Sequence, residues 1–535
     1  MKIRTILLGA AACAVFAAPA FAQSDTPKKH RESVESRLNK MEQVIEDQQA
    51  EIKALKDEVA AKPAAAAVAE APPPQPEVTG AQFEALQNQV YEQAAATRSA
   101  ATVTVKKLRP TIASSDGKNT LSIRADVMAD YAAYTKSAVP TAAFNGANGE
   151  QQLRDGFNFR RAQFGIEGKI AGDFSYRFIY DFGGAGGNET GQINTVSPAT
   201  PNVGTGGRVK EMWVGYTGFL APFTFKVGAG PWPANLEDAT ASDDLLLDER
   251  ASPAQLSRGL AADDGRDGLG FIGNGDIWNF STFLTGDSFG KGSLDGQGAV
   301  VSRAAVAPVQ DSATNFNVHL GANASYVFKP EQTAAAVPTG SSAFPADLEN
   351  ISFSDRPELR VTDIKLINTG NISADSAYTA GLEFAMSYQA FQVQSEYFWY
   401  GVERRNPATD VRNPNFHGWY VEGSYVLTGE PRTYSMASAS FTRPSPAASF
   451  NPGAGNWGAW ELAARYSNSD LNFDLDSATT GEPVKGGEQN IWSAGLNFYP
   501  NDNVKFMFDW QDVSVVKATI PTKYDDFIFR TQLTL

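Results

Sequence analysis

The chain is poor in the residues that build metal and thiol sites. It has one cysteine and three histidines among 535 residues. The cysteine, Cys13, lies in the N-terminal segment, so a chain cleaved after Ala22 has neither disulfides nor thiol chemistry. His30, His319 and His417 have no metal-ligand spacing. The sequence therefore predicts no metal and no cofactor.

Long apolar runs are also missing. After the N-terminal segment there is no stretch of about 18 apolar residues, which excludes a helical membrane protein. The net charge of -15 comes without a basic patch, which argues against a nucleic-acid partner. Adjacent carboxylates such as Asp243 and Asp244 lack the separation that glycoside chemistry needs. We expect no enzyme; the alternative of a secreted β-rich hydrolase predicts a water-soluble monomer.

The N-terminus has the organisation of an exported protein. Residues 1–22 combine Lys2 and Arg4 with an apolar run and an Ala20-Phe21-Ala22 cleavage site, which predicts a signal peptide. Apolar residues then alternate four and three apart, which predicts a periplasmic coiled coil over 23–60 or, alternatively, one amphipathic helix lying on the rest of the protein. Residues 61–118 form an Ala/Pro-rich linker with a possible short helix over 83–97.

What the chain has in abundance is alternation. In the stretch 157–182, Phe164, Phe178 and Tyr180 lie on one parity, whereas charged residues such as Arg161 and Arg177 lie on the other. Side chains point to opposite faces at successive positions of a strand, so this is a hairpin with one aromatic and one charged face. A soluble protein would pack the aromatic face on a core; a membrane barrel would turn it to lipid and let the charged face line a wet channel.

The pattern continues to the C-terminus and gives an all-β fold, a transmembrane antiparallel β-barrel of about 16 strands over 119–535. The expected strands are 121–134, 157–170, 173–182, 207–217, 223–230, 268–274, 277–286, 315–328, 357–366, 378–388, 391–402, 417–428, 458–470, 490–499, 503–514 and 526–535. Long connections such as 287–314 alternate with tight turns such as 171–173, as outer-membrane barrels require. We interpret 329–356 and 429–457 as insertions at the periplasmic end.

The long connection 231–267 is crowded with charges of both signs, including Asp248, Glu249 and Arg250. In a barrel of this size a loop here predicts an inward fold that narrows the pore with a transverse field. A solvated surface loop is the alternative.

Several pieces resemble one family. FRRAQFGIEGKIAGDFSYRFIYDF, GLAADDGRDGLGF, AGLEFAMSYQAFQVQSEYFW, GAWELAARYSNSDLNF and GLNFYPNDNVKFMFDWQDV together make the chain similar to the phosphate-selective porins O and P of Gram-negative outer membranes. The resemblance implies a trimeric 16-stranded porin in the cell outer membrane, surrounded by lipid, that passes small anions such as phosphate by passive diffusion. The terminal Leu535 departs from the usual aromatic residue.

The candidate pore-lining or solute-binding residues are the cations expected to face the lumen from strands and loop: Arg161, Lys169, Arg177, Lys226, Arg250, Arg258, Arg266, Arg465, Lys505 and Arg530. Carboxylates such as Glu211 and Asp509 share this parity, so the predicted lining is mixed and anion selectivity is a hypothesis. A general or sugar/organic-solute porin of the same fold is one alternative. Another is a structural envelope protein whose periplasmic coiled coil contacts peptidoglycan.

Overall fold

The computed structural model describes residues 81, 84–85, 87–92, 101–140, 150–153, 155–183, 207–289, 296–332, 349–362, 364–405, 407, 411–476 and 482–535. The chain divides into two units, Met1–Asn88 and Gln89–Leu535. The signal peptide and coiled coil predicted for 1–60 lie outside the described residues. Residues 87–92 are helical, within the range predicted for a short helix. None of the helices in the described ranges combines the length and apolarity needed to span a bilayer.

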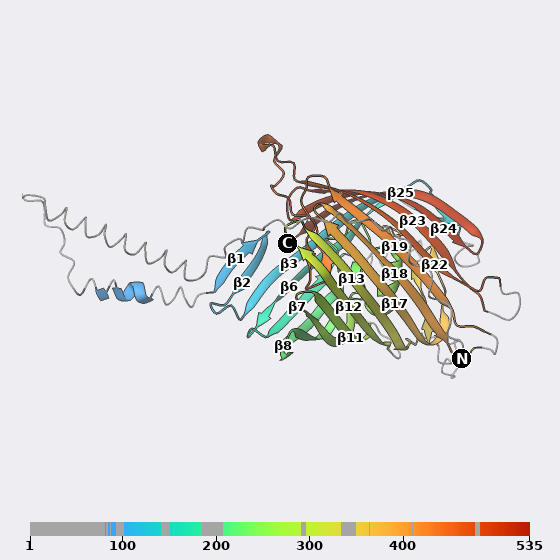
Figure 1. Ribbon diagram of the computed structural model, residues 1–535, viewed down its shortest axis with the longest axis horizontal. Coiled ribbons are helices and arrows are strands. Elements are labelled where there is room, and N and C mark those ends of the chain that lie inside the picture. Colours follow the sequence, from blue (N-terminus) through green and yellow to red (C-terminus); the bar gives the residue numbers. More distant parts are fainter. Residues whose placement is uncertain are drawn as a thin grey trace, which may run out of the picture. The chain divides into compact units, whose positions relative to one another are not determined.

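Sixteen strands of the described chain form a closed antiparallel barrel (Figure 1). Each strand pairs with the next, and the last pairs with the first, so that Arg530 faces Asp130 across the closing seam. The barrel strands are β3 (Thr120–Tyr134), β6 (Gly156–Ile170), β7 (Phe174–Asp181), β8 (Arg208–Leu220), β9 (Phe223–Gly230), β10 (Arg266–Asn274), β11 (Trp278–Ser288), β12 (Gly298–Asp311), β13 (Phe316–Lys329), β17 (Ile372–Tyr388), β18 (Phe391–Arg404), β19 (Asn415–Val426), β22 (Ala459–Phe473), β23 (Val484–Tyr499), β24 (Val504–Lys517) and β25 (Ile520–Thr534).

The two faces of the wall differ as the alternation predicts. On β24, the side chain of Phe508 is 51% exposed, whereas its neighbour Asp509 is 1% exposed. Large apolar side chains such as Phe164, Phe384 and Trp492 are exposed around the outside, whereas polar side chains fill the inside. This confirms an apolar outer wall and a polar interior, the arrangement of an outer-membrane barrel.

The predicted strand number is right, but two of its members are wrong. The expected loop 287–314 contains the barrel strand β12, whose inward positions Ala299, Val301 and Ala305 are apolar, so its alternation is weak. The expected strand 357–366 is not in the barrel wall. Its Leu359 and Leu366 are buried in cores inside the barrel.

The two ends of the barrel differ. The end that holds Leu535, here the turn end, has the tight turns, among them 171–173, 221–222, 389–390 and 500–503. The opposite loop end carries the connections 135–155, 182–207, 231–265, 289–297, 330–371, 405–414 and 474–483, together with the tight turn 518–519. The connections 329–356 and 429–457 were predicted to be insertions at the same end, but the first belongs to the loop end. The insertion 429–457 does leave from the turn end.

A hairpin lies inside the segment predicted to be a linker. β1 (Thr102–Lys106) pairs with β2 (Arg109–Ala113), and β2 extends the sheet beside the start of β3. Its turn places Lys107 and Leu108 at φ of 49° and 59°. Two-residue hairpin turns with positive φ are normally marked by Gly or Asn, so the sequence did not reveal this one.

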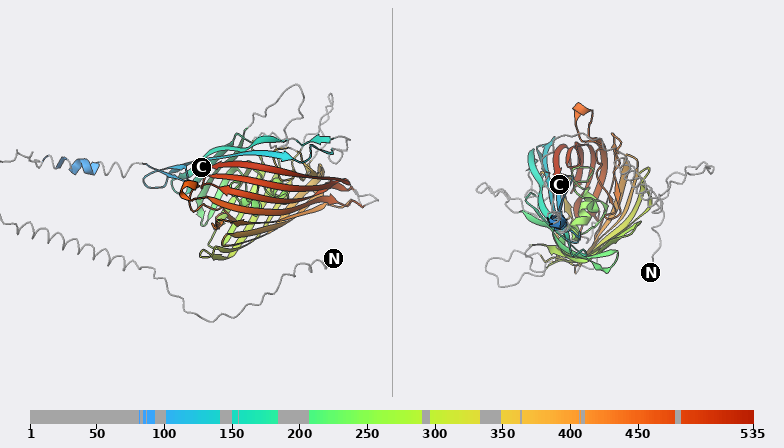
Figure 2. Two further views of the ribbon diagram at one scale, coloured as in Figure 1. Left: turned by 90° about the horizontal axis from the view of Figure 1, so that it is seen from above. Right: turned by 90° about the vertical axis from the view of Figure 1, so that its left-hand side faces the viewer.

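Three connections fold into the barrel. The third loop, 231–265, carries α4 (Leu236–Ala239) and α5 (Ser252–Ala261), and the view along the barrel shows the green helix inside the ring (Figure 2). The segment 349–371 carries β14 (Asn350–Ile351), β15 (Ser354–Asp355) and β16 (Ile367–Asn368). The segment 427–458 carries β20 (Tyr434–Ser435) and β21 (Ser440–Phe441), whose Phe441 is buried with Leu236 and Ala385. The same segment also carries η1 (Pro452–Ala454), which has no buried residue and projects from the barrel (Figure 1). In the connection 135–155, between β3 and β6, β4 (Ala138–Pro140) pairs with β5 (Glu150–Gln152).

The third loop packs against one side of the wall. Ala254 and Leu256 of α5 belong to one buried apolar cluster with Tyr400 and Phe416 of β18 and β19. The hydroxyl of Tyr400 donates to the carbonyl of Pro253 over 2.8 Å. Because this side is filled, the space left for solutes lies against the strands opposite, β3 and β6–β10.

Candidate functional site

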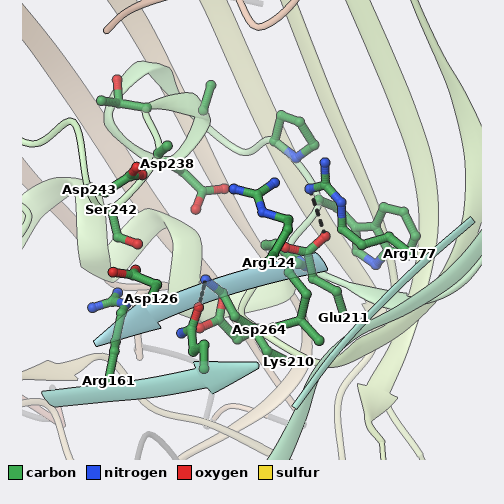
Figure 3. A pocket seen from close by; sticks show the side chains of 18 of the residues that line it. Arg124, Asp126, Arg161, Arg177, Lys210, Glu211, Asp238, Ser242, Asp243 and Asp264 are labelled. Carbon is green, nitrogen blue, oxygen red and sulfur yellow. Dashed lines mark hydrogen bonds and ion pairs between the residues drawn. The ribbon is translucent and has the colours of Figure 1, made fainter. Parts of the chain in front are cut away.

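A cavity of 370 Å³ lies between the third loop and the inner faces of these strands (Figure 3). Seven basic and five acidic side chains line it, a net of two positive charges. The basic residues are Arg124, Arg161, Arg177, Lys210, Lys226, Arg250 and Arg258; the acidic ones are Asp126, Glu211, Asp238, Asp243 and Asp264. A second cavity, of 630 Å³, shares Arg124, Asp243 and Thr534 with the first and continues toward the hairpin β1–β2.

Two β-bulges bring extra cations into the lumen. In β6 the register shifts opposite Met128 and Ala129, and both Arg160 and Arg161 become buried. In β8 the register shifts opposite Ile179 and Tyr180, and adjacent Lys210 and Glu211 both line the cavity. A bulge breaks the period of two, so alternation alone placed Arg161 inside but missed Arg160 and Lys210.

Three cations on the strands that line the cavity have no carboxylate partner among the described residues. Arg161 Nη1 lies 3.9 Å from the sulfur of Met128. Lys210 Nζ donates to Gln163 Oε1 over 3.1 Å, and Lys226 Nζ lies 4.1 Å from the ring centroid of Trp213. Amide oxygens and aromatic rings carry no net charge, so these cations keep theirs.

The other cations of the cavity are neutralised or tied to the backbone. Arg177 lies 2.9 Å from Glu167 and 3.2 Å from Glu211, and Arg124 lies 3.2 Å from Glu167. Arg258 pairs with Asp238, Asp263 and Asp264. Arg250 donates to the carbonyls of Glu237 and Thr240, within its own loop. Arg124, Arg177 and Arg258 therefore contribute less net charge, whereas Arg250 keeps its charge but is held within the loop.

Three of the predicted residues anchor the third loop instead of lining the cavity. Arg530 lies 2.6 Å from Asp130 and 2.9 Å from Asp248. Arg465 donates to Glu249 O over 2.9 Å. Lys505 donates to the carbonyl of Leu245 over 2.7 Å. All three cations are buried, and each joins a barrel strand to the third loop.

The arginines that join the wall to the third loop also keep a carboxylate of this loop ionised. Arg160 pairs with Glu249 and donates from Nη2 over 3.0 Å. Burial alone would raise the pKa of Glu249, but Arg160 and Arg530 hold the pKa of that carboxyl well below its usual range. Glu249 therefore stays ionised and the pair with Arg160 persists.

One carboxylate cluster has the geometry of a cation site. Ligand atoms of Asp130, Asp248 and Glu249 lie within 4.8 Å of one another. The guanidinium of Arg530 already lies between them, 3.3 Å from Glu249 and closer to the other two. An internal arginine therefore supplies the positive charge that these carboxylates need.

Two predicted residues lie away from the cavity. Lys169 is exposed near the turn end of β6 and is not among the lining residues. Arg266 begins β10 and donates to the carbonyl of Gly286 over 2.9 Å. Arg124, unlike these, lines the cavity but was absent from the predicted set.

An acidic pair of the third loop predicts a pH effect. Burial and the adjacent Asp243 carboxylate raise the pKa of Asp244 to about 6, against the opposing effect of Arg443 and Arg432. Asp244 is therefore ionised above that pH and neutral below it. Acidification removes a negative charge beside Asp243, which lines the cavity, so we expect the ratio of anion to cation permeability to rise between about pH 7.5 and about pH 5.

The measurement is the zero-current potential in a KCl gradient at both pH values. Asp244→Asn keeps a side-chain oxygen for the amide of Arg443, which now donates to Asp244 over 3.0 Å, but does not titrate. The variant is expected to respond less to acidification than the unaltered channel. Identical responses would show that another group carries the pH dependence.

The described fold and cavity can now be compared with known proteins. The family model of phosphate-selective porin O and P matches residues 139–534. The chain belongs to the phosphate-selective porin O and P family. The family predicted from the sequence pieces is thus confirmed, and the described residues before 139, including β1, β2 and β3, lie outside the matched region.

Two relatives extend the comparison. Porin O of Pseudomonas aeruginosa is 26% identical over 454 residues, which cover 79% of this chain and 90% of the relative. An uncharacterised protein of Caulobacter vibrioides is 28% identical over 222 residues, 41% of this chain and 42% of that protein. Family and fold together make the chain an outer-membrane porin, with a channel fold in place of an enzyme fold.

Solved structures give a weaker comparison. An anion-selective porin from Comamonas acidovorans is 9% identical, with 78% of this chain and 100% of that chain covered and a TM-score of 0.45. OprB of Pseudomonas putida also has a TM-score of 0.45, with 78% and 94% covered at 9% identity.

Proposed function

We propose that the chain is a passive, anion-preferring channel whose selective region is the cavity under the third loop. The observation that carries the proposal is a set of three strand cations, Arg161, Lys210 and Lys226, on the wall of a cavity with net positive charge; none of them has a carboxylate partner in the described part of the chain. A permeating anion gains from each of these charges, whereas a cation is repelled. The pore needs no covalent chemistry.

Phosphate is the proposed physiological class of solute. The name of the family and that of the relative Porin O suggest it, and ammonium and guanidinium groups together suit a small oxyanion. We also propose a homotrimer with its turn end and N-terminal segment in the periplasm, since outer-membrane barrels keep their short turns on that side. A peptidoglycan contact through residues 23–60 remains a separate proposal.

Competition measures the solute class directly. Phosphate that occupies the cavity should lower the chloride conductance of single reconstituted channels, and Lys210→Gln should weaken this inhibition by about tenfold in concentration. Lys169→Gln removes the same charge from an exposed site outside the cavity and should behave as the unaltered channel. Chloride current that is indifferent to phosphate would contradict the phosphate assignment.

The five carboxylates of the cavity favour a second candidate, a general small-solute porin. Such a channel would pass neutral sugars readily and would give a zero-current potential near zero in a salt gradient.

A further inference from the structure

Trp213 occupies an unusual position, because its aromatic ring lies in the charged wall of the cavity. It sits on β8, opposite Arg177 of β7 and Gly228 of β9. Lys226, two residues before Gly228, also belongs to β9, so the ring has one cation on each neighbouring strand. The Lys226 ammonium is 4.1 Å from the ring centroid and the Arg177 guanidinium carbon is 5.5 Å from it.

The ring is fixed from its own strand. Trp213 Nε1 donates to Glu211 Oε2 over 3.1 Å, and this oxygen also accepts from Arg177 Nη1 over 3.2 Å. One carboxylate thus orients the indole and the guanidinium together. Arg177 also forms an ion pair with Glu167, at a distance of 2.9 Å. This second partner holds Arg177 whether or not the ring is present.

Lys226 differs from Arg177 in this respect. It forms no ion pair with any described residue, and its ammonium lies over the ring of Trp213. A cation over an indole face gains about 0.5–2 kcal/mol from the ring quadrupole, but the ring adds no negative charge. A carboxylate at the same place would hold the ammonium equally well and cancel its charge for passing ions.

Resting on the anion preference proposed above, we infer that Trp213 is a positioning residue for selectivity: it holds the Lys226 ammonium toward the cavity without neutralising it. The indole acts through Lys226 and needs no contact of its own with the solute. The two like charges, Lys226 and Arg177, approach the ring from different neighbouring strands.

The test compares zero-current potentials in a KCl gradient. Trp213→Leu is expected to lower the ratio of anion to cation permeability severalfold, because Lys226 loses its fixed position, whereas Trp213→Phe keeps a ring face and should restore most of the ratio. Trp492→Leu is the matched control, since Trp492 is 59% exposed on the outer wall. It should leave the ratio unchanged.

A double-mutant cycle separates positioning from general damage. In a Lys226→Met background, Trp213→Leu should change the permeability ratio no further. An unchanged ratio in Trp213→Leu alone, or an equal effect in both backgrounds, would overturn the inference. A variant that fails to fold is recognised because it does not insert as a channel. In that case the permeability ratio of Trp213→Phe is compared with that of the unaltered channel. If the unaltered channel prefers cations, the proposed function itself fails; if it prefers anions and Trp213→Leu has no effect, only this inference fails.

Discussion

Replacing Arg161, Lys210 and Lys226 together by glutamine should abolish the anion preference of the channel. These are the cavity cations on the barrel strands that have no carboxylate partner among the described residues, and their removal leaves four basic against five acidic side chains around the cavity. A unit charge about 5 Å away changes the energy of an ion by about 1 kcal/mol in water and about 3 kcal/mol at an effective dielectric constant of about 20. The permeability ratio should therefore fall by at least about tenfold.

A matched variant removes the same number of charges elsewhere. Lys169, Lys485 and Lys523 are described lysines that do not line the cavity, and their replacement by glutamine gives the same net charge for the whole chain. Zero-current potentials in a KCl gradient at low and high salt measure both variants. A fall of equal size in both would mean that the overall field selects ions and the cavity does not.

Arg530→Leu is expected to release the third loop. The substitution leaves Asp130, Asp248 and Glu249 buried without the guanidinium that lies among them. Loss of one partner from a buried ion pair typically costs about 3–5 kcal/mol. We expect a lower free energy of unfolding, a larger and noisier single-channel conductance, and new protease cleavage within 231–265.

The control for this anchor is an exposed arginine. Arg412 pairs with Asp474 but its side chain is 67% exposed, and such pairs contribute about 0–1 kcal/mol. Arg412→Leu should therefore leave conductance and protease resistance unchanged. If Arg530→Leu behaves in the same way, the loop is held by its apolar contacts with β18 and β19 and the charge network is secondary.

The sequence predicted the wall of this molecule better than its interior. Alternation identified the outer aromatic face and fifteen of the sixteen strands because the period of two survives over most of the wall; the total was right because the false strand 357–366 offset the missed β12. It failed at β12, where the inward positions are apolar, and at Arg160 and Lys210, where bulges break the period. The position of a bulge cannot be read from the alternation of polar and apolar residues.

The site was predictable only in part. Parity placed Arg161, Arg177 and Lys226 inside, and all three line the cavity. It also placed Arg465 and Arg530 inside, but whether an inward cation meets solvent or a carboxylate depends on how the third loop folds. That contact joins residues more than 200 positions apart, such as Arg465 and Glu237, and no local pattern reports it.

A preference of the lumen for anions is tested most directly by one electrical measurement. A single purified channel in a planar bilayer, with KCl more concentrated on one side, gives a zero-current potential. We expect a potential with the sign of the chloride equilibrium potential, and this potential should approach zero as salt screens the wall charges. A potential with the sign of the potassium equilibrium potential would contradict it.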